Sequence, residues 1–497
     1  MARQSSFIYT PEQVREIDRI AIEDLGIPGY ELMSRAGRAV FALGRARFPQ
    51  AHRWLVLCGA GNNAGDGYVV ARLALAAGLA VTVAALSDPR RLQGDAARAW
   101  RDFAGAGGEI VQFTANLLGD AELVIDALLG TGLGRTLEGP YLHAVECMHT
   151  ASAPVLAVDV PSGLCARTGR VLGAAVRAAL TVTFIGRKQG LYLGAGPEYT
   201  GEVEFADLGV PLERVSHVPP ALRLFDDEDC ARVLPRRART AHKGDFGHVL
   251  VIGGNEGMPG AVRLAGEAAL RAGAGLVSIA TRAEHAAIIA GSRPELMCRG
   301  VRDPADLEPL LARASVVAIG PGLGQDEWAR GLFARVIAID QPLVMDADAL
   351  NLLAGQPGPR PGWILTPHPG EAARLLRGQT STIQSDRLQA LADLGARFGG
   401  VCLLKGRCTL VGQPGELPYV IDGGNPGMAS AGMGDVLTGL VAGITAQHRA
   451  PGLLQAAACA AFVHARAGDD VARAAGERGL LAGDLLARLR PWLNPTA

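Results

Sequence analysis

Short apolar, β-branched segments alternate with Ala-, Leu- and Arg-rich segments along the whole chain. Segments with helical periodicity, such as residues 68–78 and 261–275, lie between the strand-like ones. The strand-like segments are 53–59, 80–86, 123–130, 154–163 and 179–186, followed by 248–254, 276–281, 315–322, 342–349, 363–371 and 401–406. This alternation predicts an α/β protein with parallel sheets and helices on both faces of each sheet.

Residues 209–240 interrupt the alternation. This segment is rich in Pro and charged residues and has no clear period, which is typical of a domain boundary. A chain of 497 residues is also long enough for more than one domain. We therefore expect two α/β domains, at residues 1–215 and 222–497, and their different loop motifs indicate that they are not repeats.

Composition narrows the class of protein. Hydrophobic residues make up 49% and charged residues 20% of the chain, which suits a folded globular protein. The net charge of −1 and the lack of a long basic segment predict no nucleic-acid partner. The amino-terminal segment has no apolar signal core, and the apolar stretches 73–87 and 451–465 are too short to span a membrane. Eight scattered cysteines, without a C-x-x-C pair, favour reduced thiols in a cytoplasmic protein without zinc.

The residues directly after each strand are the candidates for a site, because ligands bind at the carboxyl ends of parallel strands. After the first strand comes "GAGNNAGDG", which suggests a loop that binds a ligand through the amides of Asn62 and Asn63 and through Asp66. The string weakly matches a dinucleotide fingerprint, but Asp88 is the nearest acidic residue after the second strand. An NAD-dependent dehydrogenase and a plain Asn-rich turn are therefore the alternatives.

Two further strand ends in the first half carry oxygen-rich side chains. Asp126 is followed by Gly130, Gly132 and Gly134, and the next strand is followed by Asp159 and Ser162. Each Asp could be a helix cap or a buried, hydrogen-bonded carboxylate, but three such strand ends in one domain favour a shared site. Carboxylate, amide and hydroxyl oxygens without Cys or His suit a hard cation, such as an alkali metal, Mg²⁺ or Ca²⁺.

The motifs "GAGNNAGDGYVVAR", "VIDALLGTGLGR" and "VDVPSGL" resemble, in this order, the NAD(P)H-hydrate epimerase domain over about residues 8–215. The resemblance implies a Rossmann-like α/β/α sandwich that binds hydrated NADH or NADPH (NADHX, NADPHX). It implies K⁺ binding by Asn63, Asp126 and Ser162, and contact of Asp159 with the hydrated nicotinamide, where we expect proton chemistry at C6. The implied NAD(P)HX-binding residues are Asn62, Asn63, Ala64, Gly65, Asp66, Gly130, Thr131, Gly132, Leu133, Gly134, Arg135, Thr136 and Asp159.

In the second half, "NPGMASAGMGDVLTG" at residues 425–439 places several glycines before an apolar, helix-like segment. Glycine permits left-handed backbone and close approach of a ligand, and the N–H groups at a helix start favour an anion such as phosphate. Asp435 lies where this helix is expected to begin. From these residues alone, Asp435 is either a helix cap or a group that acts on a ligand in the loop.

Other strand ends in the second half carry similar signals. His368 lies between two prolines, and Lys405 ends a strand before Gly406 and hydroxyl side chains, as in a phosphate-binding loop. An exposed turn is the alternative for Lys405. The other candidates after strands are Gly320, Gly322, Gly324, Asp346 and Asp348.

The motifs "TPHPGE", "LLKG" and the G-x-G-D of residues 432–435 resemble the ribokinase-like superfamily, and more closely the ADP- or ATP-dependent NAD(P)H-hydrate dehydratase, over about residues 222–490. The resemblance implies a ribokinase-like α/β/α domain that uses Mg²⁺ with ADP or ATP, with Asp435 as general base. Its implied NAD(P)HX-binding residues are Ala261, Gly322, Gly324, His368 and Asp435, and its implied nucleotide-binding residues are Lys405, Gly406, Arg407, Cys408, Thr409 and Gly434.

Together the two resemblances imply a bifunctional metabolite-repair enzyme. The first domain would interconvert the R and S epimers of NAD(P)HX, and the second would dehydrate the S epimer to NAD(P)H, producing AMP or ADP and phosphate. They also imply a homo-oligomer whose partners are the small molecules NADHX, NADPHX, ADP and ATP. Two alternatives stay open for single halves: a small-alcohol kinase for the second, and a non-catalytic binding module for the first.

Overall fold

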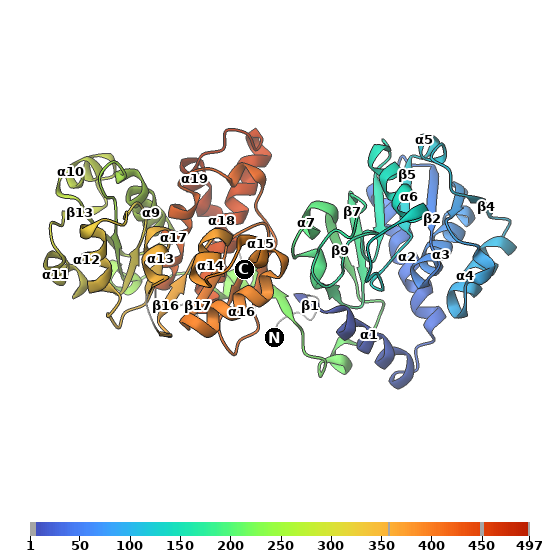
Figure 1. The fold of residues 1–497 in the computed structure, drawn as a ribbon, viewed down its shortest axis with the longest axis horizontal. Coiled ribbons are helices and arrows are strands. Elements are labelled where there is room, and N and C mark those ends of the chain that lie inside the picture. Colours follow the sequence, from blue (N-terminus) through green and yellow to red (C-terminus); the bar gives the residue numbers. More distant parts are fainter. Residues whose placement is uncertain (1–5, 356–357, 448–451, 496–497) are drawn as a thin grey trace. The chain divides into compact units, whose positions relative to one another are not determined.

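A computed structural model of the chain describes residues 6–355, 358–447 and 452–495. The chain divides into two compact units, Met1–Leu222 and Arg223–Ala497. In each unit helices flank the strands of a sheet (Figure 1). The predicted α/β class with two domains is confirmed.

The first unit contains a seven-stranded sheet with the order β4-β3-β2-β5-β6-β7-β9, and all of its strand pairs are parallel. The sequence pattern predicts five of these strands, whereas the half-exposed edge strands β4 and β9 lack a continuous apolar run. The strands are β2 Arg53–Cys58, β3 Ala80–Ala85, β4 Glu109–Gln112, β5 Leu123–Ala127, β6 Val155–Val158, β7 Leu180–Phe184 and β9 Glu202–Ala206.

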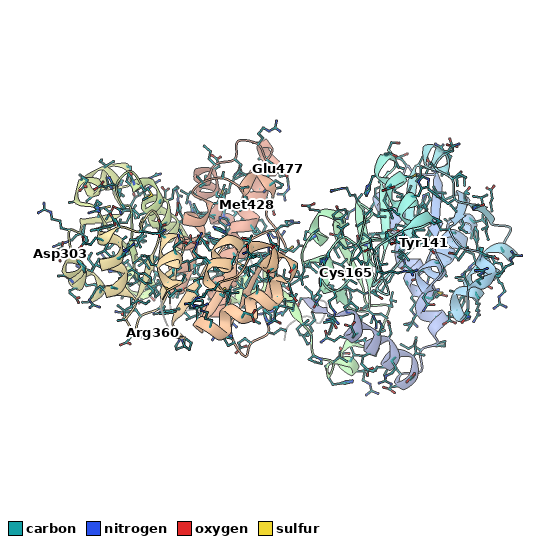
Figure 2. The ribbon with its side chains drawn as sticks, viewed as in Figure 1. Tyr141, Cys165, Asp303, Arg360, Met428 and Glu477 are labelled. Atoms are coloured by element: carbon teal, nitrogen blue, oxygen red, sulfur yellow. The ribbon has the colours of Figure 1, made fainter. Side chains whose placement is uncertain are left out.

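Both faces of this sheet are covered, because side chains alternate along each strand. Trp54 and Val56 of β2 belong to the core under α2, α3 and α4, whereas Leu55 and Leu57 belong to a second core that includes α6. Tyr141 of α6 is labelled in Figure 2 and shares a 2.9 Å hydroxyl hydrogen bond with Ser87. The helices are α2 Gly29–Arg47, α3 Asn62–Ala76, α4 Gly94–Gly105, α5 Leu117–Asp120, α6 Gly139–Thr150 and α7 Gly196–Tyr199.

Two small elements complete the first unit. Helix α1 (Pro11–Arg19) begins with a capping box, in which Thr10 accepts from the N–H of Gln13 and the Gln13 side chain accepts from the N–H of Thr10. Strand β1 (Phe7–Tyr9) pairs in parallel with the short β8 (Arg187–Lys188). These elements matter because α1 and β8 each contribute a charged side chain to the cavity described below.

The second unit contains strands in the order β13-β12-β11-β14-β15-β16-β17-β18-β19-β10. The pairs are parallel except β17–β18 and β18–β19, so the predicted parallel sheet includes two antiparallel pairs. The strands are β10 Leu222–Leu224, β11 His248–Ile252, β12 Leu276–Thr281, β13 Met297–Gly300, β14 Val316–Ile319, β15 Leu343–Met345, β16 Trp363–Leu365, β17 Val401–Leu404, β18 Thr409–Gly412 and β19 Tyr419–Ile421.

Helices α9 and α17 pack closely against each other in the second unit. A Cβ on Gly439 would lie 2.0 Å from the carbonyl oxygen of Ala265, and one on Gly443 would lie 2.7 Å from that of Ala269. Two glycines of the apolar segment after Asp435 therefore serve helix packing. The helices are α8 Asp227–Val233, α9 Pro259–Ala272, α10 Ala283–Ser292, α11 Glu308–Leu311, α12 Glu327–Val336, α13 Asp348–Leu353, α14 Pro369–Leu375, α15 Thr380–Ser385, α16 Arg387–Phe398, α17 Met433–Thr445, α18 Leu453–Ala475 and α19 Ala482–Trp492.

The segment 209–240 is more structured than the sequence predicts. It contains β10, which pairs with β19, and helix α8, which begins with a capping box at Asp226. Phe225 packs edge-on against Tyr419 and lies 5.6 Å, between ring centroids, from Phe462. Phe225, Cys230 and Val233 belong to the core of the second unit, so this part of the segment is not a linker.

Each sheet has one point where the strand order reverses direction. In the first unit β2 leads to β3 and β4 on one side, and β5 leads to β6 and β7 on the other; in the second unit the same occurs between β11 and β14. The loops that follow these strands separate at the reversal and leave a crevice there, which is where ligands bind in open α/β sheets.

Candidate functional site

A cavity of about 840 Å³ lies at the carboxyl ends of β2, β5 and β6 in the first unit. Most of the residues predicted for this unit line it, and the structure brings them together from three separate loops. The predicted residues in its wall are Asn62, Asn63, Asp66, Gly130, Thr131, Gly132, Leu133, Gly134, Arg135 and Asp159. Asp18 and Lys188, which the motifs do not indicate, line it as well.

The prediction of a loop at residues 62–66 is wrong, because helix α3 already begins at Asn62 with Gly61 as its N-cap. Ala64 and Gly65 are buried, and a Cβ on Gly65 would lie 2.6 Å from Cε of Met33. These two small residues let α3 pack closely against its neighbours. Asn62, Asn63 and Asp66 are the residues of this segment that reach the cavity.

The three residues predicted to bind K⁺ lie on adjoining loops. Asp126 is fully buried and accepts hydrogen bonds from the backbone N–H of Ser162 at 2.8 Å and from its hydroxyl at 2.6 Å. Burial raises the pKa of Asp126 to about 6, although these hydrogen bonds act to lower it. Asn63 is buried, and its Oδ1 would lie 3.3 Å from a Cβ on Gly130, at the loop that follows Asp126.

Asp159 is held in an unusual backbone conformation beside a buried lysine. Its φ of +67° is rare for a residue with a side chain. Its Oδ1 forms an ion pair with Nζ of Lys188, and accepts from Thr183 Oγ1 at 3.2 Å and from the N–H of Phe184 at 3.3 Å. The Lys188 side chain is only 2% exposed and also donates to the carbonyl of Phe184. Lys188 closely follows a predicted strand, which is a signal that could have identified it.

Two more carboxyl groups face the same cavity. Burial raises the pKa of Asp18 to about 6, with Lys188 acting to lower it and Asp159 to raise it. Burial raises the pKa of Asp66 well above its usual range, and the charges of Asp159 and Asp18 raise it further. Asp18 lies on α1, outside any recognisable motif, so nothing in the sequence pattern indicates it. Thr136 follows the glycine loop and packs near Gly173 instead.

In the second unit, Asp435 occupies the first turn of α17, as predicted. Gly432 caps the helix with a φ of +89°, which explains the need for glycine at this position. Burial raises the pKa of Asp435 to about 7; the charge of Asp346 raises it further, and Lys405 acts to lower it. A carboxyl group with this pKa, at a helix start, is suited to accept a proton near neutral pH.

Lys405 lies in a network with two carboxylates. Its Nζ is 2.7 Å from Oδ1 of Asp346 and 3.8 Å from Oε2 of Glu371, and Thr438 donates to Asp346 at 2.9 Å. Burial acts to lower the pKa of Lys405, but Asp346 and Glu371 raise it above its usual value. Lys405 is therefore not the exposed turn lysine of the alternative interpretation, since its side chain is 20% exposed. Asp435 lies within the electrostatic reach of this ammonium group.

The loop after Lys405 is shaped by a buried arginine that the sequence does not reveal. Arg387 donates to the carbonyls of Leu404 at 3.1 Å and Cys408 at 3.4 Å. A Cβ on Gly406 would lie 2.2 Å from Arg387, so a larger residue would displace it. The remaining predicted nucleotide-binding residues of this loop are Arg407, which is exposed near Asp422, Cys408, which is buried with a φ of +53°, and Thr409, which donates to the carbonyl of Gly406.

The remaining predicted residues of the second unit lie in helix α9 and on the loops that follow β14 and β16. A Cβ on Gly322 would lie 3.1 Å from Cβ of Ala261, which places these two residues together at the reversal point. The N–H of Gly324 donates to Asp348 at 2.8 Å. His368 caps α14 by accepting from the N–H of Gly370, and its side chain is 55% exposed.

The loop that precedes α17 is anchored to α18. Asn425 and the backbone N–H of Gly424 both donate to the carboxylate of Asp469, each at 3.0 Å. Met428, labelled in Figure 2, packs where Gly468 of α18 leaves room for its sulfur. His464 of α18 contacts the carbonyl of Met433 at 3.0 Å, and burial lowers its pKa to about 4. Neither Asp469 nor His464 is indicated by the motifs.

Three general features of the described residues bear on the choice of function. They contain no cluster of three His, Cys, Asp or Glu side chains arranged to hold a metal ion. No helix among them combines the length and apolar character needed to cross a membrane. The eight cysteines are all unpaired, including Cys230 and Cys459, whose sulfurs lie 3.5 Å apart.

Comparison with known proteins separates the chain into the same two parts. Residues 29–190 match the family of YjeF-related protein N-termini, and residues 249–490 match the NAD(P)H-hydrate dehydratase family. The bifunctional NAD(P)H-hydrate repair enzyme of Coxiella burnetii is 49% identical over 98% of this chain and 99% of its own. The corresponding enzyme of Escherichia coli is 44% identical over 98% of this chain and 94% of its own.

Among solved structures, a ribokinase-like superfamily protein from Enterococcus faecalis is 29% identical to this chain. It covers 55% of this chain and 95% of its own, with a TM-score of 0.51. The ribokinase-like fold expected for the second unit is thereby confirmed.

Proposed function

The chain belongs to the family of bifunctional NAD(P)H-hydrate repair enzymes, and we propose that it converts both epimers of hydrated NADH and NADPH back to the intact coenzymes. The first unit interconverts the R and S epimers, and the second dehydrates the S epimer with ADP or ATP. The observation that carries this proposal is the Asp435 carboxyl, which lies at a helix start beside the Lys405–Asp346 pair with a pKa of about 7.

Dehydration requires that the C6 hydroxyl of the hydrate become a good leaving group. Asp435 takes the proton of this hydroxyl. The C6 oxygen of the hydrate then attacks the terminal phosphorus of ADP or ATP, and the bond between this phosphorus and the bridging oxygen breaks. AMP or ADP departs, and loss of phosphate from C6 and of a proton from C5 restores the C5–C6 double bond. The N–H groups of the first turn of α17, including that of Gly434, and the Lys405 ammonium stabilise the transferring phosphoryl charge.

Mg²⁺ fits the second unit as part of the nucleotide complex. The described residues offer no dedicated cage of three ligating side chains, and Mg²⁺ commonly keeps its waters and binds mainly through substrate phosphates. The Asp346 carboxylate is already engaged by Lys405 and Thr438, so it is not a free ligand for the ion. When bound, Mg²⁺ would supply positive charge at the transferring phosphoryl group.

We further propose that Asn63, Asp126 and Ser162 bind K⁺ in the first unit. The buried Asp126 carboxylate accepts hydrogen bonds from neutral groups of Ser162 and Leu128, so a cation would supply the missing counter-charge. Nδ2 of Asn63 is buried without a hydrogen-bond partner among the described residues, so no hydrogen bond from Nδ2 opposes binding of the ion through the amide oxygen. Replacing K⁺ with a bulky organic cation should slow epimerisation and leave dehydration unchanged.

In the first unit, the hydrated dinucleotide occupies the cavity between α3 and the glycine loop. The N–H groups at the start of α3 and of Gly130–Arg135 contact its phosphates, as expected at a reversal point. Asp159 contacts the nicotinamide at C6 and takes part in the proton transfer.

The direct test is to mix the protein with hydrated NADH, ADP or ATP, and Mg²⁺, and to follow the absorbance of reduced nicotinamide. We expect full recovery from a mixture of both epimers. Recovery of neither epimer contradicts the proposal, and recovery of the S epimer alone contradicts the epimerase part of it. Candidate alcohols in place of the hydrate test the kinase alternative in the same assay.

We also propose that the domains comprise residues 1–215 and 222–497 and act separately on a diffusing substrate. Each region has its own sheet and core, and no predicted site draws residues from both. Expressed separately, the fragments should each keep one activity, and mixing them should restore clearance of both epimers.

The unpaired cysteines suit a protein of the cytoplasm. We propose in addition that the protein is cytoplasmic and forms a homo-oligomer with small-molecule partners only. Light scattering of the purified protein tests the oligomeric state, and a monomer at working concentrations contradicts that part.

A further inference from the structure

The wall of the cavity in the first unit contains more acidic than basic groups. Asp18, Asp66 and Asp159 all line it, and one buried ammonium group, that of Lys188, lies among them. Lys188 forms its ion pair with Asp159 and donates its other hydrogen bond to the carbonyl of Phe184. If all three carboxyl groups were ionised, the group of four would carry two uncompensated negative charges in a partly dry site, so the cluster retains a proton.

The remaining charged residues of the cavity wall do not balance this excess. Arg15 lies on the same helix as Asp18, is more than half exposed and pairs with Glu12. Arg135 on the glycine loop is exposed, and Asp95 at the start of α4 adds another negative charge. The four inner groups therefore form a separate unit, which we call the acid cluster: Asp18, Asp66, Asp159 and Lys188.

Two residues in or beside this cluster have a backbone conformation that residues with side chains rarely adopt. Asp159 and Ile185 both have a positive φ, +67° and +64°, and they flank the cluster at the ends of β6 and β7. Such conformations persist where the surrounding structure enforces them, often at functional positions. Asp18 reaches the cavity from α1 and Asp159 from the end of β6, so the two carboxyl groups enter it from different elements.

Epimerisation at C6 makes a particular demand on such a site. C6 carries a hydroxyl and is bonded to the ring nitrogen N1, and the two epimers present that hydroxyl to opposite faces of the ring. One proton-exchanging group on each face meets this demand, provided that the pair holds one proton between them.

We propose that Asp18 is the second catalytic residue of epimerisation and works on the ring face opposite Asp159. This inference rests on the proposed epimerase function and extends it. In one direction Asp159 takes the proton of the C6 hydroxyl, the C6–N1 bond breaks, and its electron pair moves to N1 and into the conjugated carboxamide. The resulting aldehyde rotates about C5–C6, and N1 attacks its other face. The oxygen then takes a proton from Asp18.

The reverse reaction begins with Asp18 and ends with Asp159, so no oxidant, reductant or further reactant is needed. Between turnovers the proton returns from Asp159 to Asp18 within the acid cluster. Lys188 stabilises the negative charge that develops on the opened ring. Burial raises the pKa of Asp18 to about 6, which suits a group that both gives and takes a proton near neutrality.

The test uses the full chain with Asp18→Asn, and Glu16→Gln as the matched control, since Glu16 is an exposed carboxylate on the same helix. Clearance of mixed epimers has two phases: direct consumption of the S epimer and slower consumption of the R epimer through epimerisation. We expect Asp18→Asn to slow the R phase by ~10²-fold or more, with the S phase and the KM for the R epimer unchanged. Glu16→Gln should match the wild type in both phases.

A pH profile separates this catalytic role from a structural one. The mechanism needs one carboxyl group of the cluster ionised and another protonated, so the wild-type kcat for epimerisation should follow a bell-shaped curve that belongs to the cluster as a whole. The pH profile of the residual epimerisation by Asp18→Asn should no longer be bell-shaped. If Asp18→Asn proves unstable, the wild-type profile decides: a profile without two limbs overturns the proposal.

Two results are kept apart by this design. If the wild type clears the R epimer no faster than a no-enzyme control, the epimerase function itself is wrong. If the wild type clears it and Asp18→Asn does so at a similar rate, the role of Asp18 is wrong and the epimerase function stands.

Discussion

The two units place their sites at equivalent points of similar sheets but build them in different ways. In the second unit Asp435, the proton acceptor that we propose, lies in the first turn of one helix, and Lys405 and Asp346 come from the ends of nearby strands. In the first unit the charged groups come from four separate elements: α1, α3, the end of β6 and β8. A common architecture thus supports one site organised by a helix start and another organised by the meeting of distant segments.

The electrostatics of the sites differ accordingly. Asp346 in the second unit is paired with Lys405, and its pKa lies below its usual value because this pairing and its hydrogen bonds outweigh burial. In the first unit, burial instead raises the pKa of both Asp18 and Asp66. Phosphoryl transfer needs positive charge and N–H groups in place beforehand, whereas epimerisation needs protons that move.

The largest expected effect comes from Asp435→Asn. This change keeps the size of the side chain but removes the base, so dehydration should fall by ~10²–10⁴-fold while epimerisation continues. Absorbance recovery measures the first, and the R-to-S ratio measures the second. Asp393→Asn, an exposed residue of α16, is the control. Dehydration at a near wild-type rate would make Asp435 a helix cap only.

Asp159→Asn should slow epimerisation while dehydration continues, and it should also destabilise the protein. The R epimer should remain after the S epimer is consumed, with epimerisation slowed by ~10²-fold. The buried Lys188 ammonium loses its ion-pair partner, which typically destabilises a protein by about 3–5 kcal/mol. Denaturant unfolding measures this cost. In the double variant Asp159→Asn/Lys188→Met, stability should recover, because the unpaired ammonium group is removed. If Asp159→Asn alone epimerises at the wild-type rate, Asp159 has no catalytic role.

The pH dependence of dehydration sharpens the comparison. Asp435 acts as a base only when ionised, and its pKa is about 7. The kcat for dehydration should therefore rise with pH below this value, by about tenfold for each unit, and level off above it. The ionisation of Asp435 thus gives the pH profile of dehydration a single rise, whereas the pH profile of epimerisation is expected to be bell-shaped. A dehydration rate that does not change through neutrality contradicts the role of Asp435.

The smallest effect concerns packing alone. Gly439→Ala places a methyl group against the carbonyl of Ala265, and such overpacking costs about 1–3 kcal/mol. Gly291→Ala in α10 is the control, because its added Cβ would meet nothing within 4 Å. Thermal unfolding of the second unit should show destabilisation in the first variant only. Equal midpoints would mean that α9 and α17 can move apart at little cost.

Much of the second site can be predicted from the sequence because its central residue is local to one motif. The glycines before α17 and the acidic residue after them are read directly, and the structure places a left-handed Gly432 and Asp435 as expected. The helix start at Asn62 is misread, because Gly65 and Gly67 look like loop residues. Both in fact allow a helix to approach its neighbours, since a Cβ on Gly67 would lie 2.6 Å from Ala127.

The sequence by itself determines the α/β class, the two units and the strand ends that carry chemistry, because strand and helix periods and turn glycines are local signals. Only the tertiary structure decides that Asp18 and Lys188 share a cavity with Asp159, or that Arg387 shapes the loop after Lys405. Those partners are separated by long stretches of chain, and no period or motif links them. Their meeting, and the burial that raises the pKa of Asp18, depend on how helices and strand ends pack at the reversal point of the sheet.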